Sequence, residues 1–341
     1  MLPVKRKNLL WTFLISLSFI FSMERLSSFL DSPITELKEP LVLVVPKGRG
    51  LSAISDELSK KGLLSWPKLY VAYAQASSQT SIFAGEYLIY PGSSLKNILK
   101  ILTDGDVVKY KLTIPEGLRS RDFLDLLARQ PKLSHQLNGL SDAEIIATLG
   151  GKISQFEGAF FPDTYLYSKG DSDIEILQLA HDAMNRTLKE EWEQRAPDLP
   201  YRSPYEALIL ASIIEKEASS TSEKKNIAAV FVNRLKKGMR LQADPTVIYG
   251  LGDKYQGNIT RRHLKKATPY NTYVIKGLPP TPIALPGRDS IYAALHPLKT
   301  DALYFVAKGD GSHFFSASLD EHLNAVKQYQ LNRKSDYHSN P

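Results

Sequence analysis

Two carboxyl side chains, those of Glu215 and Glu217, stand at the end of a strongly apolar predicted helix. Residues 207–214 are apolar on all sides except at Ser212, which is typical of a buried helix. Apolar surroundings disfavour the charged form of a carboxyl group, and the partial negative charge of a helix C-terminus acts in the same direction. A carboxyl group that stays protonated near neutral pH can act as a general acid.

The two carboxyl groups cannot share one face of the helix. Positions 215 and 217 are about 200° apart around the axis, so one side chain should face a cleft. The other should be solvated, or paired with Lys216 or another neighbour. Taken alone, the spacing favours a solvated helix end over a catalytic site.

The sequence lacks the residues or motifs that most other catalytic chemistries need. The chain has 341 residues and no cysteine, which excludes disulfides, thiolate zinc sites, iron–sulfur clusters and cysteine nucleophiles. Seven scattered histidines form no HExxH motif, so no metal is expected. The sequence has no GxSxG motif, no P-loop and no GxGxxG after a strand. A serine hydrolase and a nucleotide-binding enzyme are therefore disfavoured, and no cofactor is expected.

For three polar residues near turns, a structural role is favoured over a role in a functional site. Asp244 precedes a proline and is a usual turn former. His296 and His313 lie in a loop-rich region, where a histidine more often satisfies hydrogen bonds than it binds substrate.

Capping signals define the helices that would position the glutamates. Ser203 and Glu206 form a capping box with a proline at the first helical position. Ser220 and Glu223 begin a second capping box, and the helix that it opens should stop at Gly238. Beyond it the chain is expected to be mostly irregular, with a strand over 303–307 and a final helix over 321–331.

The first part of the chain repeats a pattern of strand, Pro/Gly turn and amphipathic helix. The pattern is clearest at 41–62 and recurs at 91–105 and 111–127. These segments are either ordinary βα units or a small glycan-binding module, because sugar-binding repeats of the LysM type have strands flanking such helices. Composition does not separate the two interpretations.

An aromatic segment at 156–167 also allows two interpretations. Its five aromatic residues are interrupted by Gly158 and Pro162, which does not suit a regular helix. The aromatic rings can pin a loop to the core, or they can form a platform for sugar rings.

The N-terminus has the layout of a membrane anchor. A basic cluster, Lys5 to Lys7, precedes an uncharged run over 8–23. The run of about 15 residues would span about 22 Å, less than the roughly 30 Å of a hydrocarbon core, but Arg25 can extend toward the interface. The cleavage site is poor, so an anchor is favoured over a signal peptide. The basic cluster should stay in the cytoplasm.

The net charge of +7 does not indicate a nucleic-acid partner. Residues 1–30 carry four positive side chains and one negative side chain, so the remainder has a net charge of only +4. No arginine-rich stripe or nucleic-acid recognition motif appears.

Eight motifs occur in the order and spacing of a known family. They lie at 211–217, 230–235, 238–242, 244–250, 270–273, 277–280, 294–297 and 303–307. Together with the segment 157–165 and the anchor, they are distributed along most of the chain. In these motifs the sequence resembles the YceG-like family of endolytic murein transglycosylases.

The resemblance implies an α+β fold with an N-terminal membrane anchor, a small LysM-like βα subdomain and a catalytic domain of helices, loops and short strands. We expect a cytoplasmic tail at 1–8, a transmembrane anchor at 9–23, a linker at 24–40, the LysM-like subdomain at 41–108, an intermediate region at 109–200, the catalytic core at 201–332 and a C-terminal tail at 333–341. The chain would be a single-pass protein of the cell inner membrane with its catalytic part in the periplasm.

The resemblance also implies a reaction. The family cleaves the β-1,4 bond between N-acetylmuramic acid and N-acetylglucosamine within peptidoglycan glycan strands, without water, and leaves 1,6-anhydro ends. Such cleavage would end the elongation of nascent strands, in coordination with peptidoglycan synthases. One glutamate can act first as the acid and then as the base. The aligned motifs give this role to Glu217, with Glu215 as the less favoured candidate.

Further residues would line or brace the groove by the same resemblance: Asn233, Gln242, Asp244, Thr246, Tyr249, Tyr270, Asn271 and His313. The sequence departs from the family's usual residues at Ala243, Thr281, Leu285 and Leu323. These departures concern the groove and leave the glutamate in place.

Two other functions remain open. The repeated Pro-x-Gly units would also suit a membrane-anchored peptidoglycan-binding scaffold of the elongation machinery. A hydrolytic muramidase would need a second carboxylate about 5–9.5 Å from the first, and Asp244 is the candidate.

Overall fold

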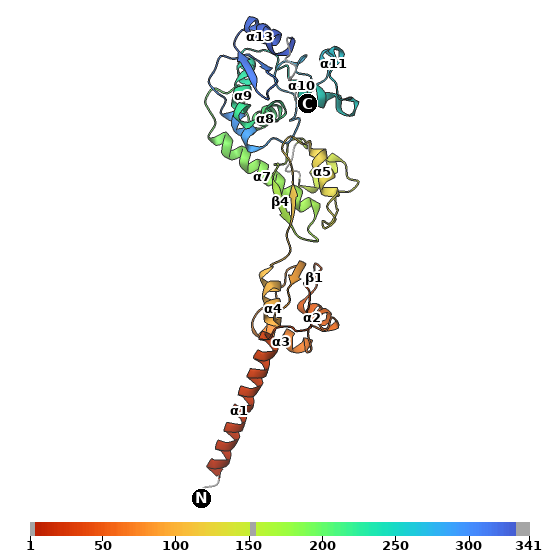
Figure 1. Cartoon of the computed structure of the whole chain (residues 1–341), viewed down its shortest axis with the longest axis vertical. Coiled ribbons are helices and arrows are strands. Elements are labelled where there is room, and N and C mark those ends of the chain that lie inside the picture. Colours follow the sequence, from red (N-terminus) through yellow and green to blue (C-terminus); the bar gives the residue numbers. More distant parts are fainter. Residues whose placement is uncertain (1–3, 151–154, 332–341) are drawn as a thin grey trace. The chain divides into compact units, whose positions relative to one another are not determined.

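The computed structural model describes residues 4–150 and 155–331, which fall into two compact units (Figure 1). The first unit contains the chain up to Tyr110 together with 132–134 and 166–171, and the second contains the rest. Helices and small two-stranded sheets make up the described chain, which confirms the expected α+β class. The predicted C-terminal tail, 333–341, and the first three residues of the predicted cytoplasmic tail lie outside the described residues.

The N-terminal helix α1 (Val4–Asp31) is longer than the uncharged run that predicts it. Its part from Phe13 to Asp31 is long and apolar enough to cross a membrane. Large apolar side chains from Trp11 to Met23 are exposed, whereas Leu30 is buried in the core of the first unit. The exposed turns are therefore the part of the helix that suits a membrane.

The structure differs from the linker that we expected over 24–40. Residues 24–31 continue α1, and Leu26 and Phe29 pack against the core of the first unit. Ile34 is buried in the same core, and its amide donates to the carbonyl of Ser93 at 3.0 Å. The apolar spacing of these side chains, which was not used in placing the linker, explains the longer helix.

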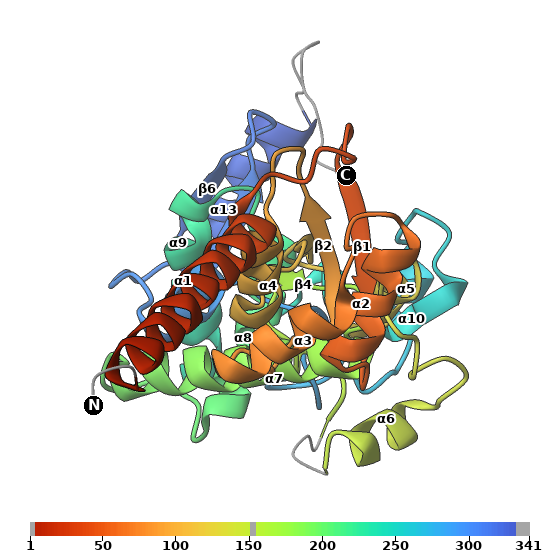
Figure 2. The same cartoon turned by 90° about the horizontal axis from the view of Figure 1, so that it is seen from below.

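The first unit is built around an antiparallel pair of strands, β1 (Leu41–Val45) and β2 (Gly85–Ile89). Three helices accompany the pair (Figure 2): α2 (Leu51–Lys60), α3 (Pro67–Ala76) and α4 (Leu95–Asp104). Leu43, Tyr87 and Ile98 are fully buried between them. The expected strand, turn and helix at 41–62 are confirmed, and so is the expected stop of α4 at Gly105, which has a left-handed φ of 71°.

A buried charge cluster explains why 132–134 and 166–171 belong to the first unit. The Glu86 carboxylate accepts hydrogen bonds from the ammonium groups of Lys132 and Lys169, at 3.1 and 2.9 Å, and from the Tyr110 hydroxyl. Burial alone would raise the pKa of Glu86, but these donors lower it to about 2. The carboxylate is therefore ionised and ties the two short segments to β2.

The second unit begins with β3 (Tyr110–Thr113) and β4 (Thr164–Tyr167), which form a two-stranded sheet, and the boundary between the units runs through both strands. Its first helices are α5 (Ser120–Ala128), α6 (Asp142–Thr148) and α7 (Asp173–Glu193). Phe156 and Phe160 are buried and pack edge to face, which favours the interpretation of the aromatic segment as a loop pinned to the core.

The core of the second unit is formed by three helices: α8 (Pro204–Glu217), α9 (Thr221–Lys236) and α12 (Arg288–Leu295). Every residue from 207 to 214 is buried, as the apolar run of α8 predicts. The Ser203 hydroxyl caps α8, as expected, by accepting the amide of Glu206 at 3.3 Å. The second capping box is wrong, because the Ser220 side chain makes no capping bond and the Glu223 carboxylate is bonded to His313 instead.

The region beyond Gly238 is more regular than expected. It contains α10 (Asp244–Leu251), α11 (Arg261–Lys265), α12, a hairpin of β5 (Tyr304–Ala307) with β6 (His313–Ser316), and α13 (Leu319–Val326) followed by a π-helical turn (Lys327–Leu331). The expected closing strand and final helix are confirmed. Helix α10 was missed because Asp244 and Pro245 suggest a turn, whereas here the proline occupies the first turn of a helix.

Candidate active site

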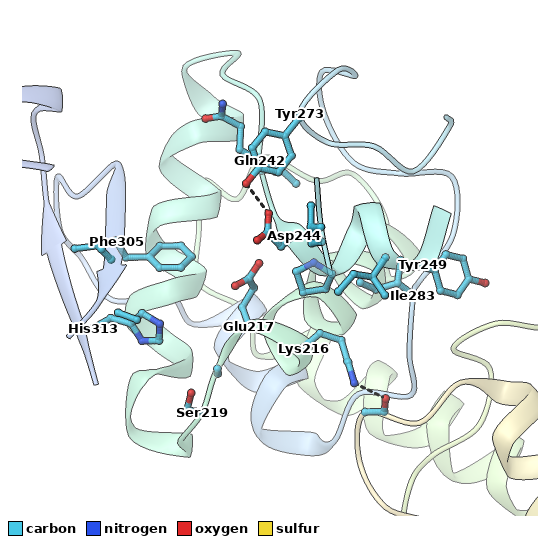
Figure 3. A pocket seen from close by; sticks show the side chains of 18 of the residues that line it. Lys216, Glu217, Ser219, Gln242, Asp244, Tyr249, Tyr273, Ile283, Phe305 and His313 are labelled. Carbon is cyan, nitrogen blue, oxygen red and sulfur yellow. Dashed lines mark hydrogen bonds between the residues drawn. The ribbon is translucent and has the colours of Figure 1, made fainter. Parts of the chain in front are cut away.

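A cleft of about 1580 Å³ lies in the second unit (Figure 3). Its walls come from the end of α8, the loop before α5, the start of α10 and the β5–β6 hairpin. Among the described residues, no group of three His, Asp or Glu side chains is placed to hold a metal ion. The side chains that line the cleft carry carboxyl, hydroxyl, amide, imidazole, guanidinium and ammonium groups.

Glu217, the last residue of α8, extends its carboxyl group into this cleft (Figure 3). The side chain is partly buried, and loss of hydration together with the nearby negative charge of Asp244 raises the pKa of this carboxyl to about 8. The backbone amide of Asp244 and the guanidinium of Arg234 act weakly in the opposite direction. At neutral pH the Glu217 carboxyl is therefore mostly protonated and able to donate a proton.

Asp244 faces Glu217 from the first turn of α10 (Figure 3). The Tyr273 hydroxyl donates to its Oδ1 at 2.7 Å. The turn before it is fixed by buried hydroxyls, because Thr272 Oγ1 accepts the amide of Ala243 at 3.0 Å and Thr246 Oγ1 donates to the carbonyl of Ala243 at 2.6 Å. These bonds present a carboxylate to Glu217 from a rigid support.

Glu215 lies outside the cleft and is fully engaged elsewhere. Its carboxylate accepts hydrogen bonds from Lys224 Nζ at 3.2 Å, the Ser290 hydroxyl at 2.6 Å and the Gly287 amide at 3.0 Å. The side chains of Glu215 and Lys224 are only 9% and 6% exposed. Glu215 is therefore a structural group that joins α8 to α9 and α12.

Three other residues that the resemblance assigned to the groove also line the cleft: Gln242, Tyr249 and His313. The imidazole Nδ1 and the backbone amide of His313 both bond to the carboxylate of Glu223, each at 2.8 Å. Gln242 has a left-handed φ of 54°, and its side-chain oxygen accepts from Arg234 at 3.3 Å. Each of these side chains is thus held in one orientation.

The remaining four predicted groove residues lie behind the walls. The Asn233 amide donates to the carbonyls of Thr300 and Ala302, at 2.7 and 3.0 Å. The Asn271 amide donates to three carbonyls of the α11 segment. The Tyr270 ring packs edge to face on Tyr249, and Thr246 supports the turn before Asp244. These four residues brace the cleft without lining it.

Sequence reasoning missed several residues of the site. Arg119 lines the cleft, and Glu157 holds the Tyr249 hydroxyl at 3.1 Å. Arg234 donates to the carbonyls of Leu303 and Leu241, at 2.6 and 2.7 Å, beneath the cleft. Arg234, Glu157 and Tyr273 lie within the motifs and were available from them. Arg119 carries no signal, because it lies outside every motif.

Comparisons with known proteins identify the family of the chain. The YceG-like family model matches residues 43–328. An endolytic murein transglycosylase of Bacillus subtilis is 32% identical over 319 residues, covering 89% of this chain and 88% of the relative. One of Streptococcus pneumoniae is 27% identical over 326 residues, and the alignment covers 86% of this chain but only 59% of that longer protein.

A solved structure is similar as well. The crystal structure of a YceG-like protein of Listeria monocytogenes superimposes with a TM-score of 0.54 at 33% sequence identity. The match covers 84% of this chain and 99% of the Listeria chain.

Proposed function

The chain belongs to the YceG-like family, and we propose that it is an endolytic murein transglycosylase that cleaves peptidoglycan glycan strands without water. The observation that carries the mechanism is the state of Glu217, whose pKa is raised to about 8 on the wall of an open cleft. The names of the relatives supply the substrate, and the geometry supplies the acid.

The first step is protonation of the leaving oxygen. Glu217 gives its proton to the oxygen of the β-1,4 bond between N-acetylmuramic acid and N-acetylglucosamine, and the bond from C1 to that oxygen breaks. Positive charge then develops at C1 of the muramyl ring. The carboxylate of Asp244, held by Tyr273, faces this region and stabilises that charge.

The second step uses the same glutamate as a base. Glu217 is now ionised, and it takes the proton of the muramyl 6-hydroxyl as that oxygen bonds to C1. The product is a 1,6-anhydro ring, and Glu217 regains its proton for the next cycle. No water molecule is consumed, so a single acid–base residue is sufficient.

The test is substitution of Glu217 with measurement of both turnover and binding. Glu217→Gln should lower turnover by about 10³-fold or more, because the amide can neither donate nor accept the proton, and glycan binding should remain. Glu215→Gln is the matched control on the same helix. Those molecules of this variant that are folded should have the turnover of the wild type. A Glu217→Gln variant with unchanged turnover would exclude this role.

The same experiment separates the enzyme from a scaffold. If the protein were only a peptidoglycan-binding scaffold, the Glu217→Gln variant would bind glycan as the wild type does, and neither protein would form new glycan ends. Loss of new glycan ends with retained binding would exclude a function limited to binding.

A hydrolytic muramidase is the second candidate, and one observation favours it. Asp244 faces Glu217 across the cleft, as the base of a two-carboxylate glycosidase would (Figure 3). Asp244 would then activate a water molecule that attacks C1. The chemical form of the new glycan end distinguishes the two reactions.

We also propose roles for the rest of the chain. The first unit, with strands β1 and β2 flanking α2 and α3, would be a LysM-like glycan-binding module. The apolar turns of α1 would anchor the chain once in the cell inner membrane, with the N-terminus in the cytoplasm and the cleft in the periplasm. Cleavage there would end nascent strands beside the peptidoglycan synthases.

A further inference from the structure

Among the described residues, one cationic side chain of the cleft forms neither an ion pair nor a hydrogen bond to a carbonyl oxygen. Arg119, Lys216 and Arg234 are the Lys and Arg residues among its described lining. Lys216 Nζ donates to the carbonyl of Gly117 at 3.1 Å, and Arg234 is bonded to carbonyls. Within residues 4–150 and 155–331, no carboxylate forms an ion pair with the guanidinium of Arg119, although other arginines have such partners.

The position of Arg119 is nevertheless fixed. Its backbone amide donates to Asp122 Oδ2 at 3.0 Å, where α5 begins, and its guanidinium lies over the ring of Tyr249 at 5.4 Å. The Tyr249 hydroxyl donates to Glu157, and Glu157 also accepts the Ser120 amide at 2.9 Å. The hydrogen bond to Glu157 thus fixes the Tyr249 ring on which the guanidinium lies.

This cation lies to one side of Glu217. Figure 3 shows Tyr249 on one side of Glu217, and Phe305 and His313 on the other. Since Arg119 lies over Tyr249, it belongs to the Tyr249 side of the cleft. A substituent of a sugar bound there would meet the guanidinium.

We propose that Arg119 forms a carboxylate-binding subsite that recognises the acidic substituents of N-acetylmuramic acid. This inference rests on the proposed function. The sugar rings of the strand are uncharged. Its carboxylates lie on the stem peptide where a peptide is attached, and on the lactyl group where the peptide is absent. A guanidinium matches a carboxylate with two parallel hydrogen bonds. The subsite would make the enzyme prefer glycan that carries a carboxylate beside the cleaved bond.

The test measures binding of soluble glycan fragments to the full-length protein in detergent, in a Glu217→Gln background so that nothing is cleaved. Three ligands are compared: strands with stem peptides, strands without peptides that keep only the lactyl carboxylate, and uncharged chitin oligosaccharides. Arg119→Gln is compared with Arg121→Gln, which removes the same charge two residues away, outside the cleft, where Arg121 pairs with Asp142 at 3.4 Å.

We expect Arg119→Gln to raise the Kd of a carboxylate-bearing strand about tenfold, the effect of losing a charge-assisted hydrogen bond. A loss confined to strands with peptides identifies the stem carboxylates, and a loss confined to strands without peptides identifies the lactyl carboxylate, which is free only there. Losses on both ligands mean that the subsite accepts either carboxylate. The difference should shrink at high salt, and Arg119→Lys should restore part of it. Arg121→Gln should leave all three values unchanged.

Two results would overturn the subsite. One is an equal loss of affinity for the uncharged chitin oligosaccharides, and the other is no loss for either carboxylate-bearing strand. Since binding is measured without turnover, these results are independent of whether the wild-type chain forms anhydro ends.

Discussion

Glu215 and Glu217 have the same side chain and lie two positions apart on α8, yet their surroundings give them opposite properties. Glu215 accepts hydrogen bonds from a lysine, a hydroxyl and an amide, which occupy its carboxyl oxygens. Glu217 has lost hydration and faces the carboxylate of Asp244, which keeps its proton in place. It is thus the neighbouring groups, and not the residue type, that make Glu217 the proposed acid.

The state of Glu217 predicts the pH dependence of the reaction. The acid must be protonated to cleave the bond, so kcat should be constant below the raised pKa and fall as pH rises through about 8. Asp244→Asn removes the negative charge that contributes to this shift, so the alkaline limb should move to lower pH. Rates measured between pH 5 and 10 with both proteins check this, and an unmoved limb would contradict the assignment.

The same shift predicts how stability depends on pH. Between the ordinary carboxyl pKa of 4.5 and about 8, the folded protein holds a proton on Glu217 that the unfolded chain has lost, so stability falls as pH rises. Glu217→Gln removes the titrating group, so the variant does not lose this part of its free energy of unfolding as pH rises. The variant should equal the wild type near pH 4 and exceed it by about 2 kcal/mol above pH 8, since residual solvent contact reduces the full effect. Denaturant unfolding at both pH values measures the difference.

At the scale of elements, α8 is held in place by an ionic group at its end. The Glu215–Lys224 pair is nearly buried and connects α8 to α9 at 3.2 Å, with Ser290 of α12 as a further donor. Glu116 lies 3.5 Å from the same ammonium, from the loop that lines the cleft. One cluster therefore fixes both the helix that carries Glu217 and part of the opposite wall.

Breaking this cluster should unfold the protein more easily without removing its chemistry. Glu215→Gln leaves the Lys224 ammonium without its nearest carboxylate, and we expect a loss of about 3 kcal/mol in the free energy of unfolding. This decrease in the free energy of unfolding is opposite in sign to the increase expected for Glu217→Gln at alkaline pH. The double variant Glu215→Gln, Lys224→Met should lose less than the sum of the single variants, and an additive result would mean that the pair does not interact.

The sequence allows α8 to be predicted because its signals are local. Ser203 caps it, a proline follows, and an unbroken apolar run shows that it is buried. Helix α10 could not be predicted in this way, since its start at Asp244 depends on distant Thr272, which accepts the amide before it. Glu223 was assigned to a cap for the same reason, because its partner His313 lies 90 residues away. Motifs located Glu217, but neither spacing nor motif indicates the free guanidinium of Arg119.

At the scale of the whole molecule, the N-terminal helix has two parts with different surroundings. Its exposed apolar turns suit a membrane, and its last turns complete the core of the first unit through Leu26, Phe29 and Leu30. The helix is therefore part of a folded unit as well as a candidate membrane anchor.

This double role predicts different outcomes for two truncations. Removing residues 2–23 should release the protein from membranes and leave the stability of the first unit unchanged. Removing 2–34 also deletes the buried side chains of Leu30 and Ile34, which should cost the first unit about 3–5 kcal/mol. Membrane fractionation and denaturant unfolding of the two proteins measure this, and equal stabilities would show that the last turns of α1 do not support the core.

The central claim is that Glu217 acts first as the acid and then as the base, so that no water enters the product. The most direct measurement is mass spectrometry of the glycan ends formed when the full-length protein digests purified peptidoglycan in ¹⁸O-labelled water. We predict 1,6-anhydro ends that are one water lighter than hydrated ends and carry no ¹⁸O. Hydrated reducing ends that carry one ¹⁸O would contradict this account and identify Asp244 as the base of a muramidase.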